Sequence, residues 1–145
     1  MNLHIYQGGT SDIGNLYELL VDFSIFLRAG ENFTMSLETL LEEKDSFSFL
    51  LATCNGIIVG FAIYTLSFFS WSGKTLFLDD LYVIEEFRGK KIGTALFERL
   101  VIIASEKGCT KIRWQVPEWN DKAISFYQKR GGIMKSKDYT YDLFI

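Results

Sequence analysis

Residues 78–96, Leu-Asp-Asp-Leu-Tyr-Val-Ile-Glu-Glu-Phe-Arg-Gly-Lys-Lys-Ile-Gly-Thr-Ala-Leu, decide the fold and indicate the chemistry. The stretch begins as an apolar strand, turns through two glycines among three basic residues, and continues as an amphipathic helix. A helix N-terminus directs N–H groups outward without intrahelical acceptors, with the positive end of the helix dipole behind them. Gly89 and Gly93 lack a Cβ and so allow an anion to approach the backbone closely. The segment therefore predicts a site for a phosphorylated cofactor.

The spacing of the glycines narrows the kind of cofactor. Neither Gly-x-Gly-x-x-Gly nor Gly-x-x-x-x-Gly-Lys-Ser/Thr occurs, so dinucleotide and P-loop sites have no support. Residues 88–93, Arg-Gly-Lys-Lys-Ile-Gly, instead resemble the Arg/Gln-x-x-Gly-x-Gly/Ala pyrophosphate loop of the GNAT superfamily of N-acetyltransferases, which use acetyl-CoA. Residues 118–132, Glu-Trp-Asn-Asp-Lys-Ala-Ile-Ser-Phe-Tyr-Gln-Lys-Arg-Gly-Gly, resemble its second cofactor segment, an Asn-x-x-Ala-x-x-Phe-Tyr helix followed by a glycine turn.

One residue of the first loop departs from the superfamily pattern. Lys91 stands where the motif usually has its first glycine. If this position needs a positive φ, the side chain costs roughly 1 kcal/mol. The lysine charge would offset that cost by facing the phosphates.

Hydrophobic periodicity and turn residues predict a single α/β domain over residues 1–145. Ser36 and Asn120 are good N-caps, Gly108 is a C-cap, and Asn55-Gly56 is a two-residue hairpin signal. Strands are expected at residues 3–6, 46–53, 57–68, 75–84, 111–116 and 139–144, and helices at 13–23, 36–44, 91–107 and 121–130. This order matches the GNAT fold, a mixed and mostly antiparallel sheet of about six to seven strands flanked by about four helices.

Composition and charge exclude several classes of protein. The chain has 145 residues, of which 48% are hydrophobic, and a net charge of −3, which argues against a disordered chain and against a nucleic-acid binder. Cys54, Cys109 and His4 have no metal-ligand spacing, so no metal is expected. The uncharged stretch 46–73 is long enough to span a bilayer, but the hairpin signal inside it favours two buried strands. With no signal peptide at the N-terminus, these features predict a cytoplasmic protein.

The resemblance implies acetyl transfer from acetyl-CoA to a primary amine by direct attack within a ternary complex. Backbone N–H groups of Leu81, Tyr82 and Val83 match those that polarise the thioester carbonyl in the superfamily. The residues that match its cofactor contacts are Leu81, Tyr82, Val83, Arg88, Gly89, Lys90, Lys91, Ile92, Gly93, Thr94, Asn120, Ala123 and Phe126.

Two proton transfers need side chains. Tyr127 matches the general acid that protonates the departing thiolate, although an amphipathic helix could equally bury it as a core aromatic. Asp79 and Asp80 are the candidates for taking a proton from the amine. Since consecutive strand residues point to opposite faces, at most one of them is expected to face the cleft. An acid pair at this place could also be a solvated face of the strand.

The amine that accepts the acetyl group is the least determined part of the predicted function. The stretch from Leu78 resembles most closely the diamine acetyltransferase branch, with its spermidine/spermine-type and thialysine-type enzymes. That branch typically has Leu-Glu-Asp here, so its glutamate maps onto Asp79, and Asp79 and Trp71 are the candidate substrate contacts. An aminoglycoside, an amino acid or a protein N-terminus stays open as acceptor, and the resemblance implies a homodimer. A module that binds acyl-CoA without turnover is the alternative, favoured by Asp79 and Lys91.

Overall fold

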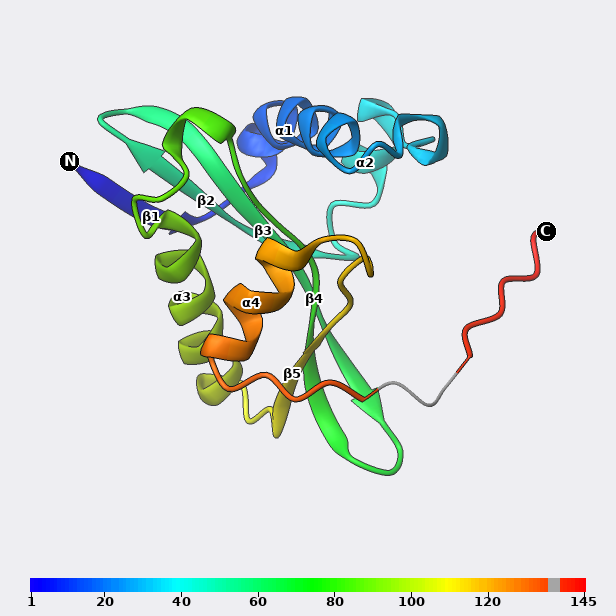
Figure 1. Ribbon diagram of the computed structural model, residues 1–145. Helices are drawn as coiled ribbons and strands as arrows, with labels where there is room; N and C mark the ends of the chain where they lie inside the picture. The colour runs from blue at the N-terminus through cyan, green and yellow to red at the C-terminus, as the bar shows by residue number, and fades with distance from the viewer. Residues whose placement is uncertain (136–138) are drawn as a thin grey trace. The chain divides into compact units, whose positions relative to one another are not determined.

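The computed structural model describes residues 1–135 and 139–145, and Figure 1 shows its helices and strands. Contacts between residues divide the chain into two compact parts, residues 1–114 and residues 115–145. Each part is described by itself below.

A five-stranded sheet is the centre of the first part. Its strands follow one another in space as in sequence, with β1 to β4 antiparallel and β5 parallel to β4. They are β1 (Leu3–Gln7), β2 (Ser48–Cys54), β3 (Ile57–Phe69), β4 (Gly73–Val83) and β5 (Lys111–Trp114). The helices are α1 (Ile13–Phe26), α2 (Leu37–Glu42) and α3 (Ile92–Glu106), with short 3-10 turns η1 (Thr10–Asp12), η2 (Gly30–Asn32) and η3 (Glu85–Phe87).

The two faces of the sheet carry different helices. On one face, Phe23 of α1 packs against Phe61 and Tyr82, with ring centroids 6.0 and 4.9 Å apart. On the other face, side-chain atoms of Leu96 of α3 and of Val83 both lie within 4 Å of the place that a Cβ at Gly60 would take. Figure 1 shows α1 and α2 together at one side of the sheet and α3 at the other. The end of β4 is therefore held between a helix on each face.

Local signals in the sequence were confirmed where they set turns and caps. Asn55 and Gly56 have φ of 52° and 82°, the paired positive values of the tight hairpin turn between β2 and β3. The Ser36 side chain accepts from the Thr39 N–H at 3.1 Å and caps α2. Gly108 has φ 75° and follows Lys107, the C-cap of α3, so that the helix ends with a left-handed residue.

The expected strand at residues 139–144 was wrong. The second part contains one helix, α4 (Asp121–Lys129), and no strand in the portion of it that the structure describes. The alternating apolar pattern at Tyr139, Tyr141 and Leu143 is real, but these side chains are exposed. A strand needs a paired neighbour for its backbone groups. The sheet therefore has five strands, rather than the six to seven expected.

Gly60 controls how closely β3 approaches β4. A Cβ placed at Gly60 would lie 2.8 Å from the backbone oxygen of Tyr82 and 3.3 Å from a methyl group of Val83. Because backbone cannot move aside cheaply, we expect Gly60→Ala to lower the free energy of unfolding by about 1–3 kcal/mol in urea denaturation. Gly14→Ala is the matched control, since nothing lies within 4 Å of its added Cβ. In helix α1 that change should be stabilising, by up to about 1 kcal/mol. Equal effects of the two changes would contradict the close approach.

Candidate active site

A β-bulge in β4 sets the positions of its two acidic residues, Asp79 and Asp80. The register of β3 with β4 shifts between Ile63 and Tyr64, whose partners are Asp80 and Leu78, so Asp79 is an extra residue without a partner of its own. Asp80 lies opposite Ile63, whose side chain packs in the core with α1. Residues directly opposite share a face of the sheet. The carboxyl of Asp80 is therefore on the α1 face, whereas Asp79 has no directly opposite residue from which its face could be read.

The electrostatic environment of the acid pair separates its two members. Burial, and secondarily the charge of Asp79, raises the pKa of Asp80 from 3.8 to about 7. Burial also raises the pKa of Asp79, although its side chain is the more exposed of the two. A carboxyl with a pKa near 7 exchanges protons readily at neutral pH. Asp80 is thus the better placed of the two to act as an acid or base.

Beyond the bulge, β4 has an open edge. β5 pairs with β4 only from Thr75 to Leu78. No other strand in the described part of the chain pairs with Asp79–Val83 on the side away from β3. We call the backbone groups that face this side the open edge of β4. An extended ligand with amide groups could add to it as a further strand does.

Two amides point to the open edge. The Ile84 N–H donates to the Val59 carbonyl at 2.9 Å, so Ile84 faces β3 with its backbone. Because backbone groups of a strand alternate in direction, Tyr82 also faces β3, whereas Leu81 and Val83 face the open edge. Of the three amides predicted to contact a thioester carbonyl, the structure thus directs two toward the side where a ligand could lie.

The loop from Arg88 to Gly93, called the anion loop here, turns directly into α3. Gly89 has φ 77° and Lys91 has φ 63°, so the residue in place of the motif glycine does adopt the left-handed conformation. Lys91 is the N-cap of α3, and its carbonyl accepts the first helical bond, from the Ala95 N–H at 3.0 Å. The side chain of Ile92 is buried, so only its backbone is available to a ligand. The first N–H groups of a helix lack the usual acceptor one turn back, and an anion site can use them.

Lys91→Gly should remove the strain at this position. We expect the free energy of unfolding to rise by about 1 kcal/mol, because glycine adopts a positive φ without a steric penalty. Urea denaturation measures the change. Lys90→Gly is the matched control, because Lys90 is the adjacent lysine and has no positive φ. This substitution should not stabilise the protein. A destabilised Lys91→Gly variant would mean that the lysine side chain contributes more than the strain costs.

The Arg88 side chain lies along the end of β4. Its Nε donates to the Val83 carbonyl at 2.9 Å, and its guanidinium carbon lies 4.3 Å from the ring centroid of Phe26 and 5.3 Å from that of Tyr82. The sequence predicted Arg88 as a contact to phosphate. In the structure its contacts are to β4 and to an aromatic residue of α1.

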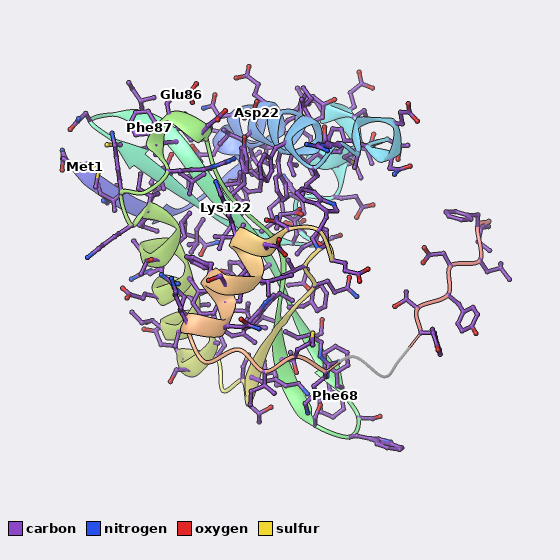
Figure 2. All side chains as sticks on the ribbon, in the orientation of Figure 1. Met1, Asp22, Phe68, Glu86, Phe87 and Lys122 are labelled. Atoms are coloured by element: carbon purple, nitrogen blue, oxygen red, sulfur yellow. The ribbon has the colours of Figure 1, made fainter. Side chains whose placement is uncertain are left out.

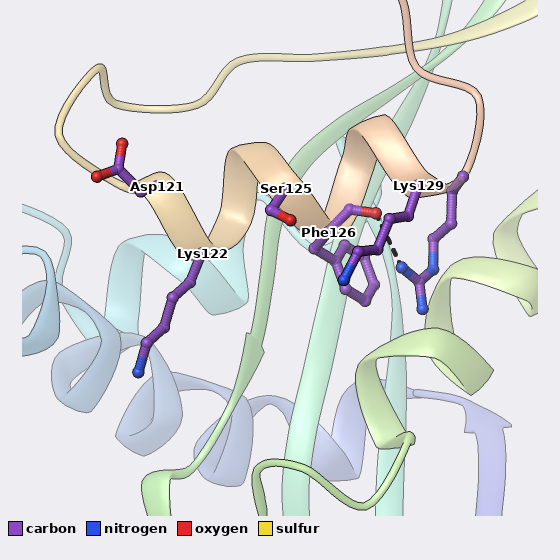
Figure 3. A pocket seen from close by; sticks show the side chains of 6 residues that line it. Asp121, Lys122, Ser125, Phe126 and Lys129 are labelled. Atoms are coloured by element: carbon purple, nitrogen blue, oxygen red, sulfur yellow. Dashed lines mark hydrogen bonds between the residues drawn. The ribbon is translucent and has the colours of Figure 1, made fainter.

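The second part of the chain carries the remaining cofactor residues on α4. The Asn120 oxygen accepts from the Ala123 N–H at 3.2 Å and caps the helix, which leaves its amide nitrogen as the group to meet a ligand. Phe126 and Tyr127 contact each other edge to face, with centroids 5.2 Å apart. Figure 3 shows a depression on this helix, lined by Asp121, Lys122, Ser125, Phe126, Lys129 and Arg130. Arg130 donates from Nη1 to the Phe126 carbonyl at 2.8 Å and stacks on its ring.

Trp71 is not brought to the acid pair. It lies fully exposed in the turn between β3 and β4, beside the exposed Phe68 that Figure 2 labels at the end of this hairpin. Along an extended strand, that turn is roughly 20 Å from Asp79. The predicted substrate contact between Trp71 and an amine held by Asp79 therefore lacks support within this part of the chain.

Neither a metal centre nor a membrane span was found in the regions that the structure covers. Across residues 1–135 and 139–145, three or more His, Cys, Asp or Glu side chains nowhere gather as metal ligands would. The helices within these same ranges are too short or too polar to cross a bilayer.

The sequence did not indicate that two residues of α1, Asp22 and Phe26, contact the end of β4. The Tyr82 hydroxyl donates to Asp22 of α1 at 2.5 Å, and Phe26 lies one helical turn after Asp22, under Arg88. The spacing of four residues places Asp22 and Phe26 on one face of the helix. Nothing in the sequence tells which strand that face meets, so this contact between α1 and β4 could not be predicted.

Comparison with known proteins identifies the family of this chain. The model of the acetyltransferase (GNAT) family matches residues 13–132. Thialysine N-epsilon-acetyltransferase of Mus musculus is 27% identical over 139 residues, covering 88% of this chain and 82% of that protein. Spermidine/spermine N(1)-acetyltransferase-like protein 1 of Homo sapiens is 36% identical over 88 residues, which are 61% of this chain and 13% of that protein.

Solved structures share the whole fold. An aminoglycoside acetyltransferase, meta-AAC0020, from an uncultured soil metagenomic sample superposes with a TM-score of 0.83 at 21% identity, covering 98% of this chain and 97% of that one. The family match spans the acid pair, the anion loop and α4 together. The chain belongs to the acetyltransferase (GNAT) family and is an acetyl-CoA-dependent N-acetyltransferase.

Proposed function

We propose that this protein acetylates a terminal primary amine of a small molecule that carries a second cationic group, as diamines and lysine-like amines do. The amine attacks the thioester of acetyl-CoA directly, and Asp80 accepts the proton that the amine must lose. The observation that carries this proposal is the acidic Asp80, partly buried beside the open edge of β4, with its pKa raised to about 7.

The raised pKa makes the proton transfer easier. An alkylammonium ion has a pKa near 10.4, so giving its proton to an ordinary aspartate is uphill by about 9 kcal/mol. With the pKa of Asp80 at about 7, the same step is uphill by about 5 kcal/mol. Asp80 is therefore the proposed general base. Asp79 adds a second negative charge nearby, which suits a substrate with two cations.

The bond changes balance without a covalent enzyme intermediate. The amine nitrogen forms a bond to the acetyl carbon, and the carbon–sulfur bond breaks. The open-edge amides of Leu81 and Val83 donate to the carbonyl oxygen as negative charge develops on it. We propose that Tyr127 gives its proton to the departing thiolate and is then reprotonated by the second proton that the nitrogen loses as the amide forms. Residues 89–93 of the anion loop and α4 residues Asn120, Ala123 and Phe126 are the proposed contacts to the rest of acetyl-CoA.

Relatives support the class of acceptor. The mouse relative is named for thialysine and the human relative for spermidine and spermine, substrates with two or more amino groups. We infer an acceptor of this kind for the present chain. We also propose a cytoplasmic homodimer, as the resemblance to the diamine branch implies. Light scattering checks the dimer, and the mass of a single chain would reject it.

A thiol-release assay tests the function. Acetyl-CoA is offered with putrescine, spermidine, spermine, thialysine, lysine, an aminoglycoside or a peptide. We expect saturable release with a diamine or with thialysine. Release only with the aminoglycoside or the peptide would keep the transferase and reject the acceptor class. No release, in a protein that still binds CoA in calorimetry, would favour the binding module.

A further inference from the structure

Four side chains from three segments meet at the end of β4. Asp22 and Phe26 come from α1, Tyr82 from β4 itself, and Arg88 from the start of the anion loop. The Tyr82 hydroxyl donates to Asp22 Oδ2 at 2.5 Å, and the Arg88 guanidinium stacks 4.3 Å from the Phe26 ring centroid and 5.3 Å from that of Tyr82. Figure 2 labels Asp22 on α1. We call this group the β4 clamp.

The clamp reaches the peptide that borders the open edge. Arg88 Nε donates to the Val83 carbonyl at 2.9 Å. Val83 directs its N–H to the same side as that carbonyl, so the arginine holds the residue that offers one of the two open-edge amides. The next amide along, that of Ile84, donates to Val59 of β3 at 2.9 Å. One peptide group is thus fixed from both sides.

The rest of the clamp fixes the arginine. Two aromatic rings hold the guanidinium plane, and a cation over such rings is attracted by their quadrupoles. Burial, helped by the bond to Asp22, raises the pKa of Tyr82 to about 12. The phenol therefore keeps its proton and remains the donor to Asp22 at neutral pH. The guanidinium of Arg88 thus contacts both the end of β4 and α1.

We propose that Arg88 is a positioning residue, held by Asp22, Phe26 and Tyr82, that fixes the Val83 peptide for the acetyl group instead of binding the cofactor phosphates. The proposal rests on the proposed function, because it assigns the open edge to the thioester. It assigns a role to Arg88, the first residue of the anion loop. Arginine in this place then ties the anion loop to the edge where the acetyl group reacts.

Two acyl donors separate positioning from phosphate binding. S-acetylpantetheine carries the same thioester as acetyl-CoA but lacks the diphosphate and the nucleotide. We expect Arg88→Gln to lower kcat/KM about tenfold with both donors, the size of one lost hydrogen bond together with a cation–π contact. Lys90→Gln, which removes a loop charge, should lower it with acetyl-CoA alone. A loss in Arg88→Gln that disappears with S-acetylpantetheine would overturn the proposal.

Conservative variants sharpen the distinction. Arg88→Lys keeps the charge but has no Nε–H and no planar group to stack, so it should not restore activity. Recovery in Arg88→Lys would indicate a phosphate contact. Tyr82→Phe keeps the ring and removes the bond to Asp22, and it should lower kcat/KM with both donors by a smaller factor. In the double variant with Arg88→Gln this loss should not add, because both residues act through one contact.

Amide hydrogen exchange tests the clamp without turnover. In the free protein, Arg88→Gln should speed exchange of the Ile84 amide at least fivefold, because the peptide loses one of its two anchors. Lys90→Gln should leave that exchange as in the wild type. An Ile84 amide that is equally protected in Arg88→Gln would contradict the clamp. If the wild type transfers acetyl to no amine, the proposed function fails, while this exchange still decides whether Arg88 holds β4.

Discussion

Asp80→Asn is expected to lower kcat/KM for the acceptor amine at least about 100-fold at pH 8, because the general base of the reaction is lost. In the wild type, the rate should fall tenfold per pH unit below about pH 7, where Asp80 takes up a proton and can no longer accept one. This acidic limb of the pH–rate profile should be absent in Asp80→Asn. The pH dependence of initial rates under limiting amine measures both effects.

Asp79→Asn is the informative comparison for this prediction. The charge of Asp79 contributes to the raised pKa of Asp80. Removing that charge should move the limb to lower pH while leaving most of kcat at saturating amine and pH 8. A limb that stays near pH 7 in Asp80→Asn would assign it to another group and reject Asp80 as the base.

The stability of Asp80→Asn shows whether a loss of activity in this variant comes from a loss of folding. The pKa of Asp80 is higher in the folded protein than in an unfolded chain, so the folded state binds more protons between about pH 4 and 7. This group therefore costs stability as pH rises through that window, by at most about 4 kcal/mol and by less where solvent screens the charge. Asp80→Asn removes the cost. It should be at least as stable as the wild type at pH 8 in urea denaturation.

Tyr127→Phe is expected to lower kcat by about 100-fold while changing the dissociation constant for CoA by less than threefold. The phenol is the proposed donor to the leaving thiolate, and general acids of this kind contribute factors of about 10²–10⁴. The phenylalanine ring can keep the edge-to-face contact with Phe126. Steady-state kinetics and calorimetry with CoA measure the two quantities.

Tyr64→Phe is the control for loss of a phenol. The Tyr64 hydroxyl donates to Gln7 at 3.0 Å, and the proposed chemistry assigns it no role. Its loss should cost about 1 kcal/mol of stability and leave kcat as in the wild type. A kcat for Tyr127→Phe that is also unchanged would reject Tyr127 as the general acid.

The sequence predicted those features that short stretches of chain determine by themselves. The glycine turn before α3, the Asn55-Gly56 turn and the Ser36 cap depend on residues a few positions apart, and each was confirmed in its local geometry. The strain at Lys91 could be predicted because a missing motif glycine has a steric consequence.

Features that depend on distant pairing could not be predicted in the same way. The bulge at Asp79 is defined by its register with β3, fifteen or more residues away in the chain. The contacts of Arg88 need α1 to pack on the end of β4, and a motif does not contain that information. The segment at residues 139–144 has the alternation of a strand, yet pattern alone cannot supply a partner.

Direct transfer within a ternary complex is the central claim, and an initial-rate matrix tests it most directly. Acetyl-CoA and the preferred amine are varied together, and reciprocal rates are plotted at each fixed concentration of the other. The account predicts lines that intersect, with no acetyl group found on the protein by mass spectrometry. Parallel lines, together with an acetylated enzyme that forms before the amine is added, would contradict it.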